Sequence, residues 1–195
     1  EGLGITEAPN EENLLELFDK RWVKGGYESK KHEEKRKKSG IKVMKDFYTK
    51  FYSEDQNPYR MEQSFTINLP ESSFVGKIDR IDLVEMKEGI PFVEIIDYKT
   101  GKLKSTSEIK KDLQLPLYTM FAEQSLGVKV VKAKYIFVEE GEEVEVDISP
   151  ERREKAKDNI SEVIEAIKEK DFTATPSFFK CKYCDYSSIC EDAIL

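Results

Sequence analysis

An apolar run that ends in Asp97-Tyr98-Lys99 is the feature that most restricts how this chain can fold. Residues 93–96 are apolar and β-branched apart from Glu94, which favours a strand. A second strand-like run, residues 73–85, lies upstream across a turn that contains Gly89, so we predict an antiparallel hairpin. Because strand side chains alternate between faces, Asp97 and Lys99 should point to the same side of the sheet. The hairpin could bring Asp79 beside them.

The remaining pattern predicts further helices and strands around this hairpin. Helix signals include Asn10 as an N-cap, Gly25-Gly26 and Gly127 as stops, and Pro150 at a first helical position. We predict helices over about 10–24, 29–52, 107–126 and 150–170, and strands over 60–69, 73–85, 91–98, 129–138 and 143–148. The last two strands should form a second hairpin around Gly141. This order predicts one α/β domain with a central mixed β-sheet flanked by helices, followed by a Cys-rich C-terminal tail.

Composition restricts the setting of the chain. Its 195 residues carry a net charge of −7, which argues against indiscriminate nucleic-acid binding by the whole surface. No apolar run approaches the ~18 residues that span a membrane, and Glu1–Ile5 show no basic segment followed by an apolar core, so we expect a cytoplasmic protein without membrane contact. The first residue is not methionine, so we expect a fragment of a larger protein.

Asp79, Asp97 and Lys99 together offer a specific chemistry. Burial of an unpaired carboxylate costs several kcal/mol, and a divalent metal is one of few partners that compensates two of them. Two carboxylates with a neighbouring lysine suffice for metal-assisted phosphodiester hydrolysis. The alternative is that they are ordinary hairpin residues, with Asp79 paired to Arg80 or Lys77. Gly76 suits a strand position where another backbone or a ligand approaches closely.

Three ordered motifs carry a resemblance to a known family: Gly76–Asp82, Ile96–Gly101 and Gln114–Tyr118. They resemble the RecB-type branch of the PD-(D/E)XK nucleases. They are most similar to nuclease domains at the C-terminal end of UvrD/AddB-like DNA helicases, over about residues 62–190. The resemblance implies a restriction-endonuclease-like fold and a metal-dependent, exonuclease-like DNA nuclease module of a recombination or repair helicase. Its partners would be DNA and a helicase domain or subunit.

The resemblance also implies roles for individual residues. Asp79, Asp97 and the backbone carbonyl of Tyr98 would bind Mg²⁺ or Mn²⁺, because these ions prefer hard oxygen ligands. Lys99 would lie beside the attacking water. Gln114 and Tyr118 lie four apart on one helical face and would position substrate, although they could equally be ordinary helix residues. Asp82 has the opposite strand parity to Asp79, which places it outside the metal site.

The cysteine tail gives a second potential centre. Cys181, Cys184 and Cys190 resemble three of the four thiolates that hold a 4Fe-4S cluster in AddB-like and CRISPR-associated RecB-like nucleases. No fourth cysteine occurs in the chain, so zinc, a Cys181–Cys184 disulfide or three unused thiols remain alternatives. His32 lacks the Gly-x-x-His motif of the family and is interpreted as a solvated helix residue. Both absences suggest that the first helix of the family precedes Glu1.

Two groups of cations could contact phosphates. Between Lys20 and Lys50, twelve basic residues face four acidic ones, a pattern that fits either a nucleic-acid contact or a solvated helix face. Four lysines near the Asp97 strand are better placed: Lys102, Lys104, Lys110 and Lys111. We therefore divide the domain into N-terminal helices (1–56), a nuclease core (57–170) and the Cys-rich tail (171–195). Alternative functions are a non-catalytic DNA-binding or assembly module and a CRISPR-associated RecB-like nuclease.

Overall fold

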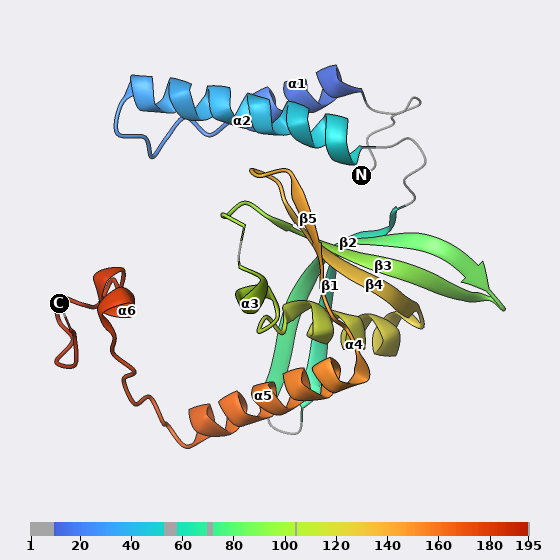
Figure 1. The fold of residues 1–195 in the computed structure, drawn as a ribbon, viewed down its shortest axis with the longest axis vertical. Helices are drawn as coiled ribbons and strands as arrows, with labels where there is room; N and C mark the ends of the chain where they lie inside the picture. Colours follow the sequence, from blue (N-terminus) through green and yellow to red (C-terminus); the bar gives the residue numbers. More distant parts are fainter. Residues whose placement is uncertain (1–9, 53–57, 70–71, 104, 195) are drawn as a thin grey trace. The chain divides into compact units, whose positions relative to one another are not determined.

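A computed structural model describes residues 10–52, 58–69, 72–103 and 105–194 of the chain. Two helices, α1 (Glu11–Arg21) and α2 (Lys30–Phe51), precede three strands, β1 (Pro58–Leu69), β2 (Ser72–Lys87) and β3 (Ile90–Lys99). The short helix α3 (Thr106–Ile109) and α4 (Gln114–Leu126) lead to β4 (Lys129–Phe137) and β5 (Glu142–Glu145). Helices α5 (Pro150–Lys168) and α6 (Phe178–Lys182) complete the described chain (Figure 1).

The strands form one mixed sheet in the order β1-β2-β3-β4-β5. All neighbouring pairs are antiparallel except β3 and β4, which are parallel and are joined through α3 and α4. Parallel strands need such a crossover, and a helix is the usual solution. Both predicted hairpins and the predicted mixed α/β sheet are confirmed.

The hydrophobic core lies between the sheet and α4. Val93 and Ile95 of β3 are fully buried, as are Leu115 and Ala122 of α4. Phe65 of β1 stacks on Phe121 of α4, with ring centroids 4.1 Å apart. Since strand side chains alternate, the residues of β3 that follow Val93 and Ile95 on this face are Asp97 and Lys99. The core therefore leads directly to the predicted site.

Gly76 makes room for a core side chain rather than for the backbone or ligand that its strand position suggested. A Cβ atom at this residue would lie 2.3 Å from Cζ of Phe65, so the bare backbone leaves room for the ring. Phe65 and Gly76 are also direct partners in the β1–β2 register. The close approach is thus made by a core side chain, and it fixes the position of β2 just before Asp79.

Three boundaries differ most from the predictions. The expected helix over 107–126 is wrong, because the structure has two helices separated by residues 110–113. Pro116 explains the break, since a proline ring clashes with the carbonyl four residues earlier, here that of Asp112. Helix α1 ends at Arg21 rather than near the glycine pair, and β5 ends at Glu145 rather than at residue 148. Asn10, Pro150 and Gly127 begin and end their helices as predicted.

The chain divides into two compact units, residues 1–156 and 157–195. The first contains the sheet with α1 to α4, and the second contains the end of α5 and the cysteine segment. The single-domain assignment and its three subdivisions remain predictions. Within the described residues, no helix combines the length and apolar character needed to cross a membrane.

Candidate nuclease site

Asp79 lies at one end of the ladder between β2 and β3, and its side chain reaches β3. The ladder between β2 and β3 begins at the pair Arg80–Ile96. One step beyond it, the backbone N–H of Tyr98 donates to Oδ2 of Asp79 at 2.9 Å. On the other side of β2, Glu62 lies between the register partners of Arg80 and Ile78 and has φ of 53°, a conformation uncommon outside glycine. The Asp79 carboxylate thus accepts the Tyr98 N–H in place of a backbone carbonyl of the strand ladder. This bond holds Asp79 next to the end of β3.

Asp97 is the most buried charged group that the described residues contain, with 3% of its surface exposed. Its Oδ2 lies 2.6 Å from Nζ of Lys99, and its Oδ1 accepts a 2.8 Å hydrogen bond from Nε2 of Gln114. The Gln114 Oε1 atom in turn accepts from Lys99 at 2.8 Å. These bonds fix the orientation of the Gln114 amide, because only its nitrogen can donate to a carboxylate. Asp97, Lys99 and Gln114 therefore form a closed triangle at the end of β3.

The surroundings of Asp97 disfavour its charged form. Burial raises the pKa of the Asp97 carboxyl above its usual range, and the charges of Asp79 and Asp112 act in the same direction. Lys99 opposes this shift but does not cancel it. The negative charges around Asp97 thus outweigh the positive charge of Lys99. A site with such an excess of negative charge attracts cations, which is the electrostatic condition for binding a divalent metal.

Two tyrosines enclose the triangle. Tyr118 accepts a 2.8 Å hydrogen bond from Gln114 Nε2, one helical turn away on α4. Burial raises the pKa of Tyr118, so this hydroxyl stays protonated at neutral pH. Tyr135 of β4 is almost fully buried, and its ring lies 4.9 Å from Nζ of Lys99. That distance is typical of a cation–π contact, which adds to the forces that hold the ammonium group.

Asp112 and Arg152 position Gln114, and the sequence alone did not point to either residue. The Asp112 carboxylate accepts a 3.0 Å hydrogen bond from the backbone N–H of Gln114 at the start of α4. Pro116 has no N–H to offer the Asp112 carbonyl, and this carbonyl instead accepts a 2.9 Å bond from Nη2 of Arg152. The signal for Asp112 is local, an aspartate two residues before a helix start. Arg152 lies forty residues away and gives no such signal.

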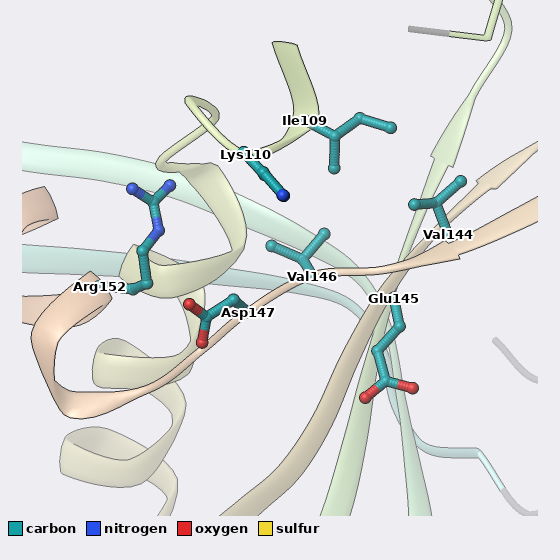
Figure 2. A pocket seen from close by; sticks show the side chains of 7 residues that line it. All are labelled: Ile109, Lys110, Val144, Glu145, Val146, Asp147 and Arg152. Atoms are coloured by element: carbon teal, nitrogen blue, oxygen red, sulfur yellow. The ribbon is translucent and has the colours of Figure 1, made fainter. Parts of the chain in front are cut away.

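A pocket of about 370 Å³ lies beside the segment that leads into α4. Its lining combines apolar Ile109, Val144 and Val146 with charged Lys110, Arg152, Glu145 and Asp147. Figure 2 shows the Lys110 and Arg152 side chains on one side of this pocket and the Val146 side chain next to Lys110. Of the predicted DNA-binding lysines, Lys110 thus lies close in sequence and space to the residues that position Gln114.

The other predicted residues fall outside this triangle. Lys102 and Lys111 are exposed, and Lys104 lies outside the described residues. Asp82 pairs with Arg80 through bonds of 2.6 and 2.8 Å on the opposite face, as its parity predicted. His32 lies in the first turn of α2 and contacts Tyr27 and Glu28, away from both aspartates.

The cysteine segment shows no assembled metal site. Cys181 is buried, Cys184 and Cys190 are exposed, and all three thiols are free. Within the described part of the chain, no three Cys, His, Asp or Glu side chains are grouped so that they could hold a metal ion. The residues present therefore do not fit an iron–sulfur cluster or a four-ligand zinc site, and the cluster remains a prediction from resemblance alone.

Comparison with known proteins assigns the family. The profile of the PD-(D/E)XK nuclease superfamily matches residues 4–191. The chain belongs to this superfamily. The mixed sheet flanked by helices confirms the predicted restriction-endonuclease-like α/β fold of this superfamily, whereas its RecB-type branch remains a prediction.

The solved structures that match this PD-(D/E)XK chain are distant from it. One is a protein from Eubacterium rectale to which exonuclease activity has been ascribed, with 15% identity and a TM-score of 0.46 over 95% of this chain and 70% of that one. Another is SSO0001, with 15% identity and a TM-score of 0.39 over 95% of each chain. No curated protein matches the chain.

The donors at the end of β3 fit a hard divalent cation. Asp79 and Asp97 supply carboxylate oxygens in a field that Asp112 makes more negative. Mg²⁺ retains several waters and needs only one or two protein carboxylates, so two aspartates suffice. A site of this kind is compatible with the lack of a three-carboxylate group among the described residues.

Proposed function

We propose that this chain is a metal-dependent deoxyribonuclease that hydrolyses phosphodiester bonds in an exonuclease-like manner. The observation that carries the proposal is the triangle of Asp97, Lys99 and Gln114, with Asp79 held beside it by the Tyr98 N–H. Membership of the PD-(D/E)XK nuclease superfamily supports the reaction class. The predicted roles of these side chains are part of the proposal.

Each residue of the site has a distinct task in this proposal. Asp79 and Asp97, together with the backbone carbonyl of Tyr98, would hold Mg²⁺ or Mn²⁺. When bound, the metal lowers the pKa of a coordinated water and neutralises charge on the phosphate oxygens. The Lys99 ammonium donates a hydrogen bond to the attacking oxygen and stabilises negative charge that develops at the phosphate. The Gln114 amide holds the Lys99 and Asp97 side chains in place through a hydrogen bond to each. The hydroxyl of Tyr118 accepts a further bond from the same amide.

We also propose that the nuclease works next to a DNA helicase motor. The proposal rests on the order and composition of the three motifs, which are similar to those of helicase-linked nuclease domains. The 195 residues contain no G-x-x-x-x-G-K-[ST] motif, so a motor would belong to another part of the protein or to a partner. The test measures DNA degradation with ATP, with and without a purified helicase partner. If the partner changes neither the rate of degradation nor the length of DNA degraded, this part of the proposal fails.

A cleavage assay with matched variants tests the enzyme proposal. A fluorescent single-stranded oligonucleotide should be shortened with Mg²⁺ or Mn²⁺, and Asp97→Asn or Lys99→Met should lower the rate by about 10²-fold or more. Asp82→Asn is the control. Asp82 lies on the same strand as Asp79, but its carboxylate pairs with Arg80 on the other face of the sheet. Full activity in both site variants would refute the assignment.

A binding module is the second candidate. One observation favours it: in the structure, both oxygens of Asp97 already face a protein partner. DNA binding without cleavage at any Mg²⁺ or Mn²⁺ concentration would support this alternative over the enzyme.

A further inference from the structure

Five lysines form a straight stripe along α2: Lys31, Lys35, Lys38, Lys42 and Lys45. Their spacing alternates between four and three residues, so at 3.6 residues per turn they fall within an arc of about 80°. The stripe is about 21 Å long, at 1.5 Å per residue. All five side chains are exposed.

The opposite side of α2 faces the rest of the first unit. A Cβ atom at Gly40 would meet the ring of Phe18 on α1, and the ring of Phe47 contacts that of Tyr98 on β3. Phe47 and Gly40 lie on the far side of the helix from the lysine stripe at 3.6 residues per turn. The lysine stripe therefore points away from the contacts that α2 makes with α1 and β3.

The charge of the stripe is only partly balanced within the protein. Lys42 pairs with Asp46, and Lys45 lies 3.5 Å from Glu11. No residue that the structure describes forms an ion pair with Lys31, Lys35 or Lys38. Like charges three and four residues apart lower the stability of a helix. The chain retains this arrangement although its overall net charge is −7.

We propose that the lysine stripe binds the phosphate backbone of a nucleic-acid strand. The choice of nucleic acid rests on the proposed function, and charge complementarity with a linear polyanion supports it. A protein partner is disfavoured, because the centres of protein interfaces are depleted in lysine, whereas five lysines make up this stripe. Lysines are flexible point charges, so the contact should be independent of sequence and sensitive to salt.

The salt dependence of binding tests this inference. The 195-residue chain is titrated against a fluorescent 30-nucleotide single strand in EDTA, where metal-dependent cleavage does not occur. The variant replaces all five stripe lysines with glutamine, which is a good helix former. Each lost phosphate contact removes roughly 0.7 from the slope of log K against log salt concentration, so the slope should fall by about 3.5.

A second variant with the same charge change is the control. It replaces exposed lysines from other parts of the chain with glutamine: Lys24, Lys87, Lys129, Lys155 and Lys170. This variant should lower the slope by less than about one, and circular dichroism should show both variants folded. An unchanged slope in the stripe variant, or equal losses in both variants, would overturn the inference.

Two further outcomes distinguish strand binding by the stripe from self-association and from catalysis. If the stripe variant changes only self-association of the protein at low salt, measured by sedimentation without DNA, the stripe is a protein contact and the inference is wrong. If the wild-type chain never cleaves DNA but the stripe variant loses the predicted slope, the nuclease proposal fails while the stripe assignment stands.

Discussion

Replacing Lys99 by methionine should destabilise the protein, because it leaves Asp97 as a buried carboxylate without a countercharge. Methionine retains most of the aliphatic volume of lysine, so the change removes mainly charge. The two charged atoms are 2.6 Å apart, and the Asp97 side chain is 4% exposed. At an effective dielectric constant of 20, that separation corresponds to a Coulomb energy of about 6 kcal/mol, which the cost of desolvating both groups offsets in part.

The expected net loss is about 3 kcal/mol at pH 7. Removing one partner of a buried ion pair costs about 3–5 kcal/mol. The lower end applies here, because a quarter of the Lys99 side chain is exposed and Gln114 still donates to Asp97. A double-mutant cycle with Asp97→Asn isolates this effect. The double variant should recover most of the lost stability, since asparagine carries no charge and can still accept the Gln114 bond.

Urea unfolding at several pH values checks the reasoning. Burial raises the pKa of Asp97 in the folded protein, and loss of Lys99 should raise it further. A folded-state pKa above the unfolded value means that ionisation opposes folding, so the deficit of Lys99→Met should be full at neutral pH. It should shrink as the pH falls through the folded pKa, because Asp97 then becomes neutral. A deficit that does not change with pH, or one that Asp97→Asn does not relieve, would refute the buried pair.

Three further predictions follow from neighbouring contacts. Asp97→Asn alone should raise the free energy of unfolding at pH 7 by about 0.5–2 kcal/mol, with the gain narrowing as the pH falls; a loss of stability in urea titrations would contradict it. Arg152→Ala should lower stability by about 1–2 kcal/mol and slow DNA cleavage several-fold, because the Asp112 carbonyl loses its donor; kinetics that match the exposed control Lys155→Ala would exclude this positioning role. Gly76→Ala should cost about 1–3 kcal/mol through its clash with Phe65, and Phe65→Leu should restore part of that loss; thermal denaturation showing an unaltered single variant would contradict the packing.

Local sequence signals were sufficient to predict the sheet and the residues at the end of β3. The run from Val93 to Ile96 marks a buried strand by composition alone, and period-two alternation then places Asp97 and Lys99 together. Gly89 and Gly141 both adopt positive φ in the turns of the two predicted hairpins. Each of these inferences depends on residues close in sequence, which is why the pattern alone was informative.

Contacts between distant segments were beyond the reach of the same signals. Ile78 and Ile81 of β2 are both fully buried, although strict alternation would place them on opposite faces. The alternation breaks between these two residues, near Asp79, where the register between β1 and β2 has no pair and Glu62 of the other strand has a positive φ. Arg152 likewise reaches Asp112 only because the start of α5 packs near the start of α4. Pro116 did carry a readable signal, a helix break, which the apolar pattern of residues 107–126 obscured.

The site gains its chemical character from positions where secondary structure is interrupted. Asp79 is free to hold the Tyr98 N–H because the β2–β3 ladder stops at Arg80. Gln114 occupies the first position of α4 because Pro116 prevents α3 from continuing through Asp112. An uninterrupted strand and an uninterrupted helix would remove both arrangements. The geometry of the site therefore depends on these interruptions, and substitution of Pro116 should displace Gln114 from Asp97 and Lys99.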